Sequence, residues 1–205
     1  MQAEGLILAG GRSRRMGGIH KGILTYNGET FTQRLINELR REIVCVRISY
    51  GSEVREDYGG CPNVMDIYPG CGPMGGIHAG LESCESQWLA VAACDMPFLK
   101  ARLFCFLMDR LSKTKGEGID CDGAVPVLGG RIHPLAAVYQ TGTAGIFEEQ
   151  IRKGNYRVQD VLKRLNILYV DLTGQKIWEK MLQNINTAEE YEGLAKRAQC
   201  GGKHE

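Results

Sequence analysis

The sequence has 205 residues, 43% of them hydrophobic, which is enough for one domain with a sizeable core. Its 25 basic and 24 acidic residues nearly cancel, which excludes the broad positive field of a general nucleic-acid or membrane-surface binder. No apolar run reaches the length of a membrane span, and the N-terminus leads into a short apolar strand without a signal peptide. We therefore expect a soluble, cytoplasmic protein with no nucleic-acid or membrane partner.

Eight cysteines raise the question of a metal or disulfide framework. No two of them form a Cys-x-x-Cys pair, the spacing that zinc sites and redox pairs normally need. Cys45, Cys94 and Cys105 lie in apolar runs, where a thiol packs as a small hydrophobic group. We expect reduced structural cysteines, with Cys71 set apart by its position in a glycine-rich loop.

The first predicted strand, residues 5–9, leads into a loop that is rich in glycine and positive charge. Residues 10–21 include four glycines, three arginines and one lysine. Glycine lets backbone N–H groups approach a ligand closely, and a loop of this kind after a strand commonly holds phosphates in α/β proteins. The P-loop pattern is excluded because Gly22 follows Lys21, and this loop contains no Gly-x-Gly-x-x-Gly. The alternative is a basic surface turn, which three arginines within four residues disfavour.

Strands and helices alternate along the rest of the chain. Further strands or extended pieces are predicted at residues 22–26, 43–49, 63–65, 88–94, 124–127, 135–139 and 167–170. Helices are predicted at residues 31–43, 77–84, 100–113, 143–152, 158–165 and 188–197. A turn at Asn27–Gly28 follows the second strand, and Thr30 or Thr32 is the expected N-cap of the first helix.

This alternation predicts an α/β fold with a mostly parallel sheet that helices cover on both faces. The turn at Gly129–Gly130 pairs the strands around Ala124 and Val138 as a hairpin, so one strand is expected to be antiparallel. We expect a single domain over residues 1–200 and a disordered tail over residues 201–205.

Three predicted strands end in groups that a nucleotide would need. Ligands of open parallel sheets bind beyond the carboxyl ends of the strands, where this chain places the basic loop, Asp66 and Asp95. Two carboxylates beside phosphates would repel them unless a cation intervened, and Mg²⁺ needs only one or two carboxylates besides the phosphates. Asp95 is therefore the predicted metal ligand. The alternative is that Asp95 caps a helix, because Asp-x-Pro is a common helix start.

The N-terminal motif resembles that of sugar-nucleotide-type nucleotidyltransferases. It comprises Leu8-Ala9-Gly10-Gly11, Arg15-Met16-Gly17 and Lys21. The double glycine resembles most the molybdenum cofactor guanylyltransferase (MobA-like) branch, whereas cytidylyltransferase relatives usually carry Ala-Gly there. Four later stretches also resemble family motifs, so the resemblance spans nearly the whole chain: Asp66 with residues 69–76, Cys94-Asp95-Met96-Pro97, His133-Pro134 and Asn184-Ile185-Asn186-Thr187.

The resemblance implies a three-layer α/β/α, Rossmann-like nucleotidyltransferase fold of the glycosyltransferase-A-like kind, with a mostly parallel mixed sheet. It implies transfer of GMP from GTP to the terminal phosphate of molybdopterin or the molybdenum cofactor, with release of pyrophosphate and with Mg²⁺ as cofactor. Proteins that deliver molybdopterin are implied as further partners. A molybdopterin cytidylyltransferase, another nucleotidyltransferase with a phosphate acceptor, and a non-catalytic nucleotide-binding protein are the alternatives.

Residue roles carry over at the matching positions. Arg15, Lys21 and Asp95 are the implied catalytic residues, with Lys21 on the triphosphate and Asp95 on Mg²⁺ and GTP. The implied nucleotide-binding residues are Leu8, Ala9, Gly10, Gly11, Lys21, Ser49, Asp66 and Asp95.

Four residues are candidates for binding the second substrate: His133, Arg157, Asn184 and Asn186. Each has a plainer alternative. His133, extended before a proline, can simply fill a strand end. The two asparagines can turn the chain into the last helix, and Arg157 can be a solvated arginine at a helix start.

A phosphate monoester acceptor is largely ionised at neutral pH, so the implied reaction needs charge neutralisation and alignment rather than a general base. Two positions depart from the family pattern. His20 stands where relatives commonly have Asp, which replaces a fixed negative charge beside Lys21. Ala188 replaces a proline after Thr187, and both residue types suit the first turn of a helix.

Overall fold

The computed structural model describes residues 3–10, 21–51 and 60–201, with side chains as far as residue 196. An eight-stranded sheet forms its centre, in the order β10-β7-β9-β6-β1-β4-β5, with β8 paired to β7. The strands are β1 (Ala3–Leu8), β4 (Val46–Ser49), β5 (Asn63–Val64), β6 (Trp88–Ala93), β7 (Gly123–Leu128), β8 (Arg131–Ile132), β9 (Ala136–Gln140) and β10 (Ile167–Asp171). All pairings are parallel except those of β9 with β6 and β7 and that of β8 with β7.

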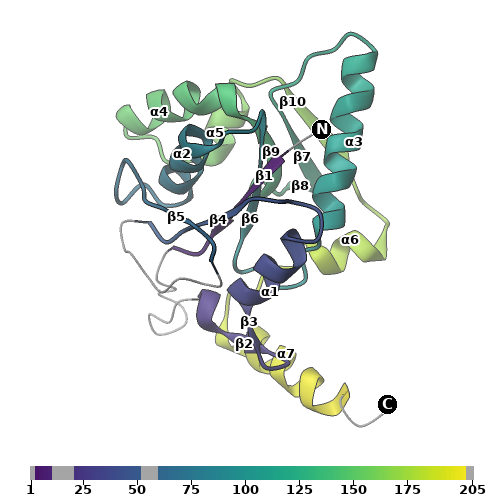
Figure 1. Cartoon of the computed structure of the whole chain (residues 1–205). Helices are drawn as coiled ribbons and strands as arrows, with labels where there is room; N and C mark the ends of the chain where they lie inside the picture. The colour runs from purple at the N-terminus through teal and green to yellow at the C-terminus, as the bar shows by residue number, and fades with distance from the viewer. Residues whose placement is uncertain (1–2, 11–20, 52–59, 202–205) are drawn as a thin grey trace.

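Helices cover both faces of the sheet, which gives three layers (Figure 1). One face carries α2 (Pro73–Ser83), α4 (Ala144–Arg152) and α5 (Val158–Leu162). The other carries α1 (Phe31–Leu39), α3 (Ala101–Gly116) and α6 (Lys176–Met181). None of the helices in the described part of the chain combines the length and apolar character that crossing a membrane requires.

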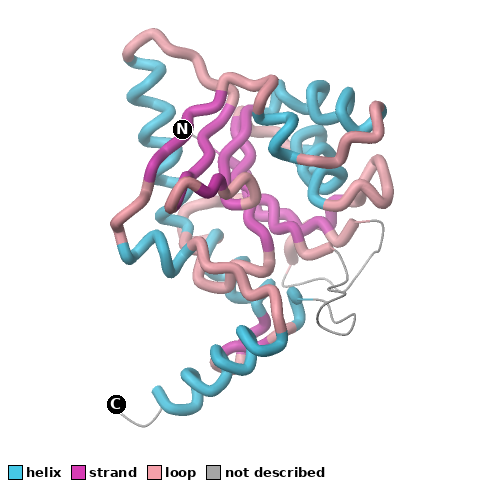
Figure 2. Tube along the Cα trace, turned by 180° about the vertical axis from the view of Figure 1, so that it is seen from behind, coloured by secondary structure: helices cyan, strands magenta, loops and turns pink. Residues whose placement is uncertain are grey.

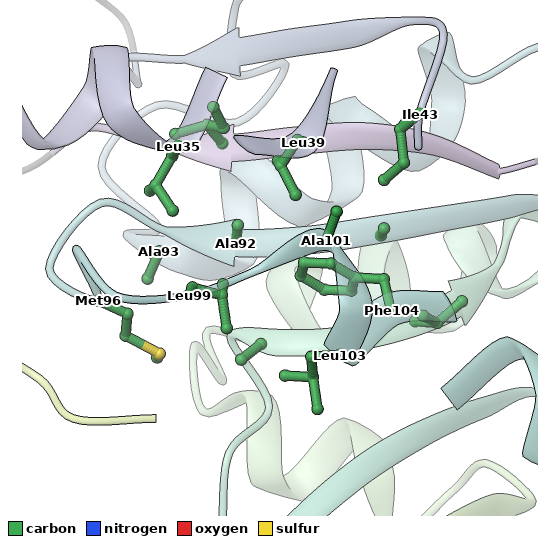
Figure 3. Close-up of a cluster of buried hydrophobic side chains, with 14 of the residues drawn as sticks. Leu35, Leu39, Ile43, Ala92, Ala93, Met96, Leu99, Ala101, Leu103 and Phe104 are labelled. Atoms are coloured by element: carbon green, nitrogen blue, oxygen red, sulfur yellow. The ribbon is translucent and has the colours of Figure 1, made fainter. Parts of the chain in front are cut away.

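The two central strands, β1 and β6, are largely apolar on both faces because their alternate residues enter two different cores. In β1, Leu6 and Leu8 pack towards α2, whereas Ile7 packs towards α1. In β6 all six residues are buried. Figure 3 shows the second of these cores, where Leu35 and Leu39 of α1 face Ala92 of β6 with Phe104 of α3 nearby. Burial on both faces is what a parallel strand with helical crossovers requires.

A hairpin near the start of the chain and the last helix meet beside the sheet. The short hairpin of β2 (Thr25–Tyr26) and β3 (Glu29–Thr30) turns at Asn27 and Gly28, whose φ angles of 51° and 80° suit a tight hairpin. The last helix, α7 (Ala188–Gly201), lies against this hairpin (Figures 1 and 2) and is joined to it by a hydrogen bond from Tyr191 Oη to the Thr25 carbonyl, 3.1 Å. A small core of Leu24, Phe31, Ile185 and Leu194 fixes the arrangement.

The predicted α/β architecture is confirmed, including the antiparallel strand, which is β9. The predicted strand at residues 43–49 is too long, since β4 begins at Val46 and Val44 is 99% exposed. The predicted helix at 77–84 starts too late, because α2 begins at Pro73. Proline suits the first turn of a helix, where its missing N–H has no partner to lose. The predicted helix at 158–165 is too long, because α5 ends at Leu162.

The extended piece predicted at residues 22–26 is wrong in its first half, where Lys21–Ile23 forms a turn of 3₁₀ helix. Thr32 explains the turn, because its hydroxyl donates to the Gly22 carbonyl at 3.1 Å. The N-cap of α1 is therefore Thr30, which accepts from the Gln33 N–H at 3.1 Å. Gly201 is the last residue of α7, and residues 202–205 lie outside the described residues, so the tail stays a prediction.

All seven cysteines whose side chains are described are free thiols. Cys94 is buried, and desolvation raises its pKa to about 12, so it stays protonated. Cys71 is buried as well. The expectation that Cys105 packs in the core is wrong: it is exposed on the outer side of α3, whose buried stripe runs through Phe104 instead.

We predict that Gly80→Ala in α2 destabilises the fold by about 1–3 kcal/mol. A Cβ there would lie 2.5 Å from Leu6 Cδ2 and 3.1 Å from Leu89 Cδ2, and both leucines are fully buried. The matched control is Gly145→Ala in α4, where a Cβ meets nothing within 4 Å and helix propensity should add about 0.5–1 kcal/mol. Urea unfolding of the two variants measures both effects. An unchanged free energy of unfolding for Gly80→Ala would contradict the close approach of α2 to the sheet.

Candidate active site

The carboxyl ends of β1, β4 and β6 lie level with one another at one edge of the sheet. The ladder continues one residue beyond β1, since Ala9 N–H donates to the Ser49 carbonyl at 2.8 Å and Cys94 N–H donates to the Leu8 carbonyl at 3.0 Å. Gly10 then packs against backbone, because a Cβ there would lie 2.9 Å from the Tyr50 carbonyl carbon. At Gly10 this edge of the sheet therefore consists of closely packed backbone without a side chain. The predicted Gly11, Arg15 and His20 lie outside the described residues.

Four polar side chains from three distant segments meet at this edge, and we name them the Lys21–Asp95 cluster: Lys21, Asp95, Asn184 and Asn186. Lys21 Nζ donates to Asp95 Oδ2 at 3.1 Å and to Asn186 Oδ1 at 2.5 Å. Asn184 Nδ2 donates to Asp95 Oδ1 at 3.2 Å. The side chains of Lys21 and Asp95 are only 17% and 19% exposed, so this ion pair is shielded more than a surface pair.

The backbone holds the same groups in place. Ile185 N–H, between the two asparagines, donates to the Asp95 carbonyl at 2.8 Å. Asp95 does not cap a helix, because α3 starts later, with Lys100 as its N-cap residue. The alternative for Asn184 and Asn186, that they merely turn the chain, omits their contacts with the ion pair.

Asp66 forms a second polar centre, just beyond β5. Ser49 Oγ donates to Asp66 Oδ1 at 3.2 Å, and the Gly51 N–H donates to Ser49 Oγ at 3.3 Å. Desolvation raises the pKa of Asp66, and the hydrogen bond from Ser49 lowers it in part. Gly75 of α2 lies directly against this carboxylate, since a Cβ there would be 2.7 Å from Asp66 Oδ2. The charged form of Asp66 therefore costs desolvation in this site, and α2 leaves no room there for another side chain.

His133 lies at the same edge, on the side of β6 away from β1. It is buried between β8 and β9, and the Ala93 N–H donates to the Leu135 carbonyl at 2.9 Å, which places this loop at the end of β6. Burial, followed by the charge of Arg131, lowers the pKa of His133 and keeps the imidazole neutral. Arg157 is exposed before α5, and the structure does not bring it into the Lys21–Asp95 cluster.

Two supporting residues were not predicted for the site. Thr32 holds the turn that carries Lys21, as described above. Glu190 fixes the backbone after Asn186: its carboxylate accepts from the N–H groups of Asn186 at 2.6 Å and Thr187 at 3.1 Å, while its own N–H donates to Thr187 Oγ1 at 3.2 Å. This is a capping box, and the Thr187-x-x-Glu190 spacing in the sequence is the signal that could have revealed it.

Residues 5–168 match the family model of the MobA-like NTP transferase domain. The chain belongs to this family. A relative from Pelotomaculum thermopropionicum, described as a probable molybdenum cofactor guanylyltransferase, is 38% identical over 170 residues, which cover 83% of this chain and 79% of that protein. The molybdenum cofactor guanylyltransferase of Serratia proteamaculans is 31% identical over 191 residues and 92% of each chain. The predicted nucleotidyltransferase family is thus confirmed, and the chain is an enzyme of that family.

Solved structures of the same fold agree. Molybdopterin-guanine dinucleotide biosynthesis protein A from Archaeoglobus fulgidus superimposes with a TM-score of 0.74 at 24% identity, covering 96% of this chain and 99% of that chain. The 2-C-methyl-D-erythritol 4-phosphate cytidylyltransferase of Thermus thermophilus gives a TM-score of 0.66 at 16% identity, covering 95% and 98%. At these identities the likeness concerns the fold, and it confirms the predicted three-layer nucleotidyltransferase architecture.

We predict that Asp66→Asn stabilises the fold at neutral pH. Because the pKa of Asp66 is raised in the folded state, its contribution to stability is fully present below the unfolded pKa and is lost as the pH rises through the folded pKa. The neutral amide avoids that loss, with a gain of up to about 1 kcal/mol after solvent screening. Thermal unfolding at pH 7 should show the gain, which should vanish near pH 3.

Asp171→Asn is the matched control. Hydrogen bonds from Thr173 lower the pKa of the exposed Asp171, so its removal should lower stability at neutral pH. An Asp66→Asn protein that unfolds at a lower temperature than the parent at pH 7 would contradict the burial argument.

Proposed function

We propose that the chain transfers GMP from GTP to the terminal phosphate of molybdopterin, or of its molybdenum-loaded form, and releases pyrophosphate. The observation that carries this proposal is the Lys21–Asp95 cluster, a cation, a carboxylate and two amides gathered at the carboxyl edge of the sheet. The guanylyl group and the molybdopterin acceptor are supported by the names of relatives that are 30–38% identical over most of the chain.

The order of the strands supports a division of this edge between the two substrates. Along the sheet the order of the contributing elements is β9, β6, β1, β4, β5. On one side, the backbone of Leu8, Ala9 and Gly10 and the pair of Ser49 and Asp66 offer hydrogen-bonding groups to a nucleoside. On the other side, next to the end of β6, His133 is placed to contact the acceptor. Asp95 stands between the two, where the reacting phosphates would meet.

The transfer forms a bond between an acceptor phosphate oxygen and the α-phosphorus of GTP, and it breaks the bond from that phosphorus to the β-phosphate oxygen. The acceptor oxygen carries no proton at neutral pH, so no base has to remove one. The clustered side chains fit this requirement, because a cation and aligned amides neutralise charge and orient groups rather than accept protons. The buried, neutral His133 need only bind.

Lys21 is proposed to neutralise the triphosphate, together with Arg15 of the preceding loop. Its present partners, Asp95 and Asn186, hold the ammonium group at the sheet edge before any phosphate reaches it. Asn186 accepts from Lys21, and its backbone N–H is held in turn by Glu190, so an uncharged amide positions the lysine beside the Asp95 carboxylate. Such pre-positioning lowers the cost of aligning the phosphates.

A divalent metal ion fits the donor set at Asp95. The described residues contain no group of three or more His, Cys, Asp or Glu side chains that could hold a metal ion by themselves. Asp95 and the amide oxygen of Asn186 are hard oxygen donors, and a site with one or two protein oxygens plus substrate phosphates is the pattern typical of Mg²⁺. When bound, the ion would neutralise charge on the α-phosphate and on the leaving pyrophosphate. We propose Asp95 as its protein ligand.

We predict that Lys21→Ala and Asp95→Ala each lower the rate of pyrophosphate release by on the order of 10²-fold or more while the fold survives. Pyrophosphate release with GTP, Mg²⁺ and molybdopterin measures turnover, and circular dichroism checks the fold. Asp109→Ala is the control, an exposed carboxylate on α3 that pairs with Lys113 at 2.7 Å away from the site. Unfolding of both site variants would show that the cluster is structural.

Calorimetric titration with GTP and CTP in Mg²⁺ tests the nucleotide directly. We expect GTP to bind more tightly than CTP. We expect this preference for GTP to weaken in Asp95→Ala. Preference for CTP would overturn the guanylyl assignment in favour of a cytidylyltransferase. Tight GTP binding without pyrophosphate release in the presence of acceptor would instead indicate a nucleotide-binding protein that does not turn over.

A further inference from the structure

A cavity of about 600 Å³ opens on the α1 and α6 side of the molecule. It lies between the β2–β3 hairpin, α1, the segment that follows Asp95, and α6, which are neighbours in Figure 1. We call it the basic pocket and define it by six of its lining residues: Tyr26, Arg34, Phe98, Lys100, Lys176 and Lys180. No member of the Lys21–Asp95 cluster lines it. It is therefore separate from the site described above.

The lining carries four basic side chains and no acidic one, in a chain whose total charge is close to zero. Two of the four are compensated outside the pocket, Lys100 by Glu38 at 2.9 Å and Arg34 by Glu29 at 3.4 Å. Within the described chain Lys176 and Lys180, both exposed on α6, have no ion pair with a carboxylate. Arg34 Nε is buried without a hydrogen-bond partner there. The pocket thus holds uncompensated positive charge.

Two aromatic rings form its apolar part. Tyr26 and Phe98 meet edge to face, with centroids 5.5 Å apart and ring planes at 83°. Lys180 Nζ lies 5.4 Å from the centre of the Phe98 ring, and the Arg34 guanidinium lies 5.0 Å from that of Tyr26. The two rings thus place apolar surface directly beside positive charge.

We propose that the basic pocket binds a small aromatic anion, a planar ring system bearing a phosphate or sulfonate group. The cavity volume lies within the roughly 300–1,000 Å³ that is typical of small-molecule sites. The planar ring system would contact Tyr26 and Phe98, and the ammonium groups of Lys176 and Lys180 would donate to its anionic group. This inference does not depend on the proposed transfer reaction, because binding is measured without turnover.

The probe is 8-anilinonaphthalene-1-sulfonate, whose fluorescence rises on binding, compared with N-phenyl-1-naphthylamine, which has the same rings without the charge. We expect the double substitution Lys176→Glu with Lys180→Glu to weaken binding of the sulfonate by about tenfold or more and to leave the uncharged probe unaffected. The control is Lys113→Glu with Lys115→Glu on α3, which changes the net charge equally and lies outside the pocket. Thermal unfolding verifies that both variants are folded.

Lys21→Ala separates the pocket from the nucleotide site. Retention of sulfonate binding in Lys21→Ala supports the proposal, and its loss there would show that the probe reports the nucleotide site. Equal binding in the two double variants would reduce the pocket to an apolar surface and overturn the proposal. In Lys21→Ala, displacement of the probe by GMP supports a small aromatic anion, whereas displacement by oligoglutamate alone would overturn it in favour of an acidic protein segment.

Discussion

The contact between Lys21 and Asp95 is the interaction on which the arrangement of the site depends. It joins the segment after β1 to the end of β6. The asparagines beside Ile185 add a third segment: Asn184 is 89 residues from its partner Asp95 in sequence, and Asn186 is 165 residues from its partner Lys21. An ion pair this shielded costs desolvation that only well-aligned partners offset. The amides of Asn184 and Asn186 supply that alignment, one on each charged group. The segments that carry Lys21, Asp95 and the two asparagines must therefore pack together before the edge of the sheet acquires its charge pattern.

The sheet determines where such a cluster can exist. Every residue of β6 is buried, with alternate side chains in the cores on its two faces, so a charged side chain has no place along the strand. Asp95 is the first charged residue beyond it, and Asp66 stands in the same relation to β5. A polar side chain within β6 would be buried without a partner, so the polar residue of this strand lies beyond its carboxyl end. The same confinement explains why strand ends in the sequence locate the site.

What the sequence reveals is accordingly local. Short apolar runs predict the strands, and apolar residues at helical spacing predict most helices. The change from an apolar run to Asp95 or Asp66 indicates the polar edge. The contact between Lys21 and Asn186 has no local pattern, since it depends on how α7 and the hairpin pack around Ile185. The short α6 was missed because only Trp178 and Met181 of its six residues are buried, too few to show a helical period. Thr32 was considered as a cap, whereas its hydroxyl holds Gly22.

Helix α2 shows which requirement wins where stability and the site conflict. Gly75, Gly76 and Gly80 each cost about 1 kcal/mol relative to Ala in a helix interior. At Gly75 a Cβ would lie 2.7 Å from Asp66 Oδ2, and at Gly76 it would lie 2.9 Å from Ser49 Oγ. The same two polar groups form the hydrogen-bonded pair at the end of β4 and β5. A helix without these glycines would hold together better by itself, but it would have to move away from the sheet edge. The bare backbone of α2 is thus what allows the Ser49–Asp66 pair to lie close against it.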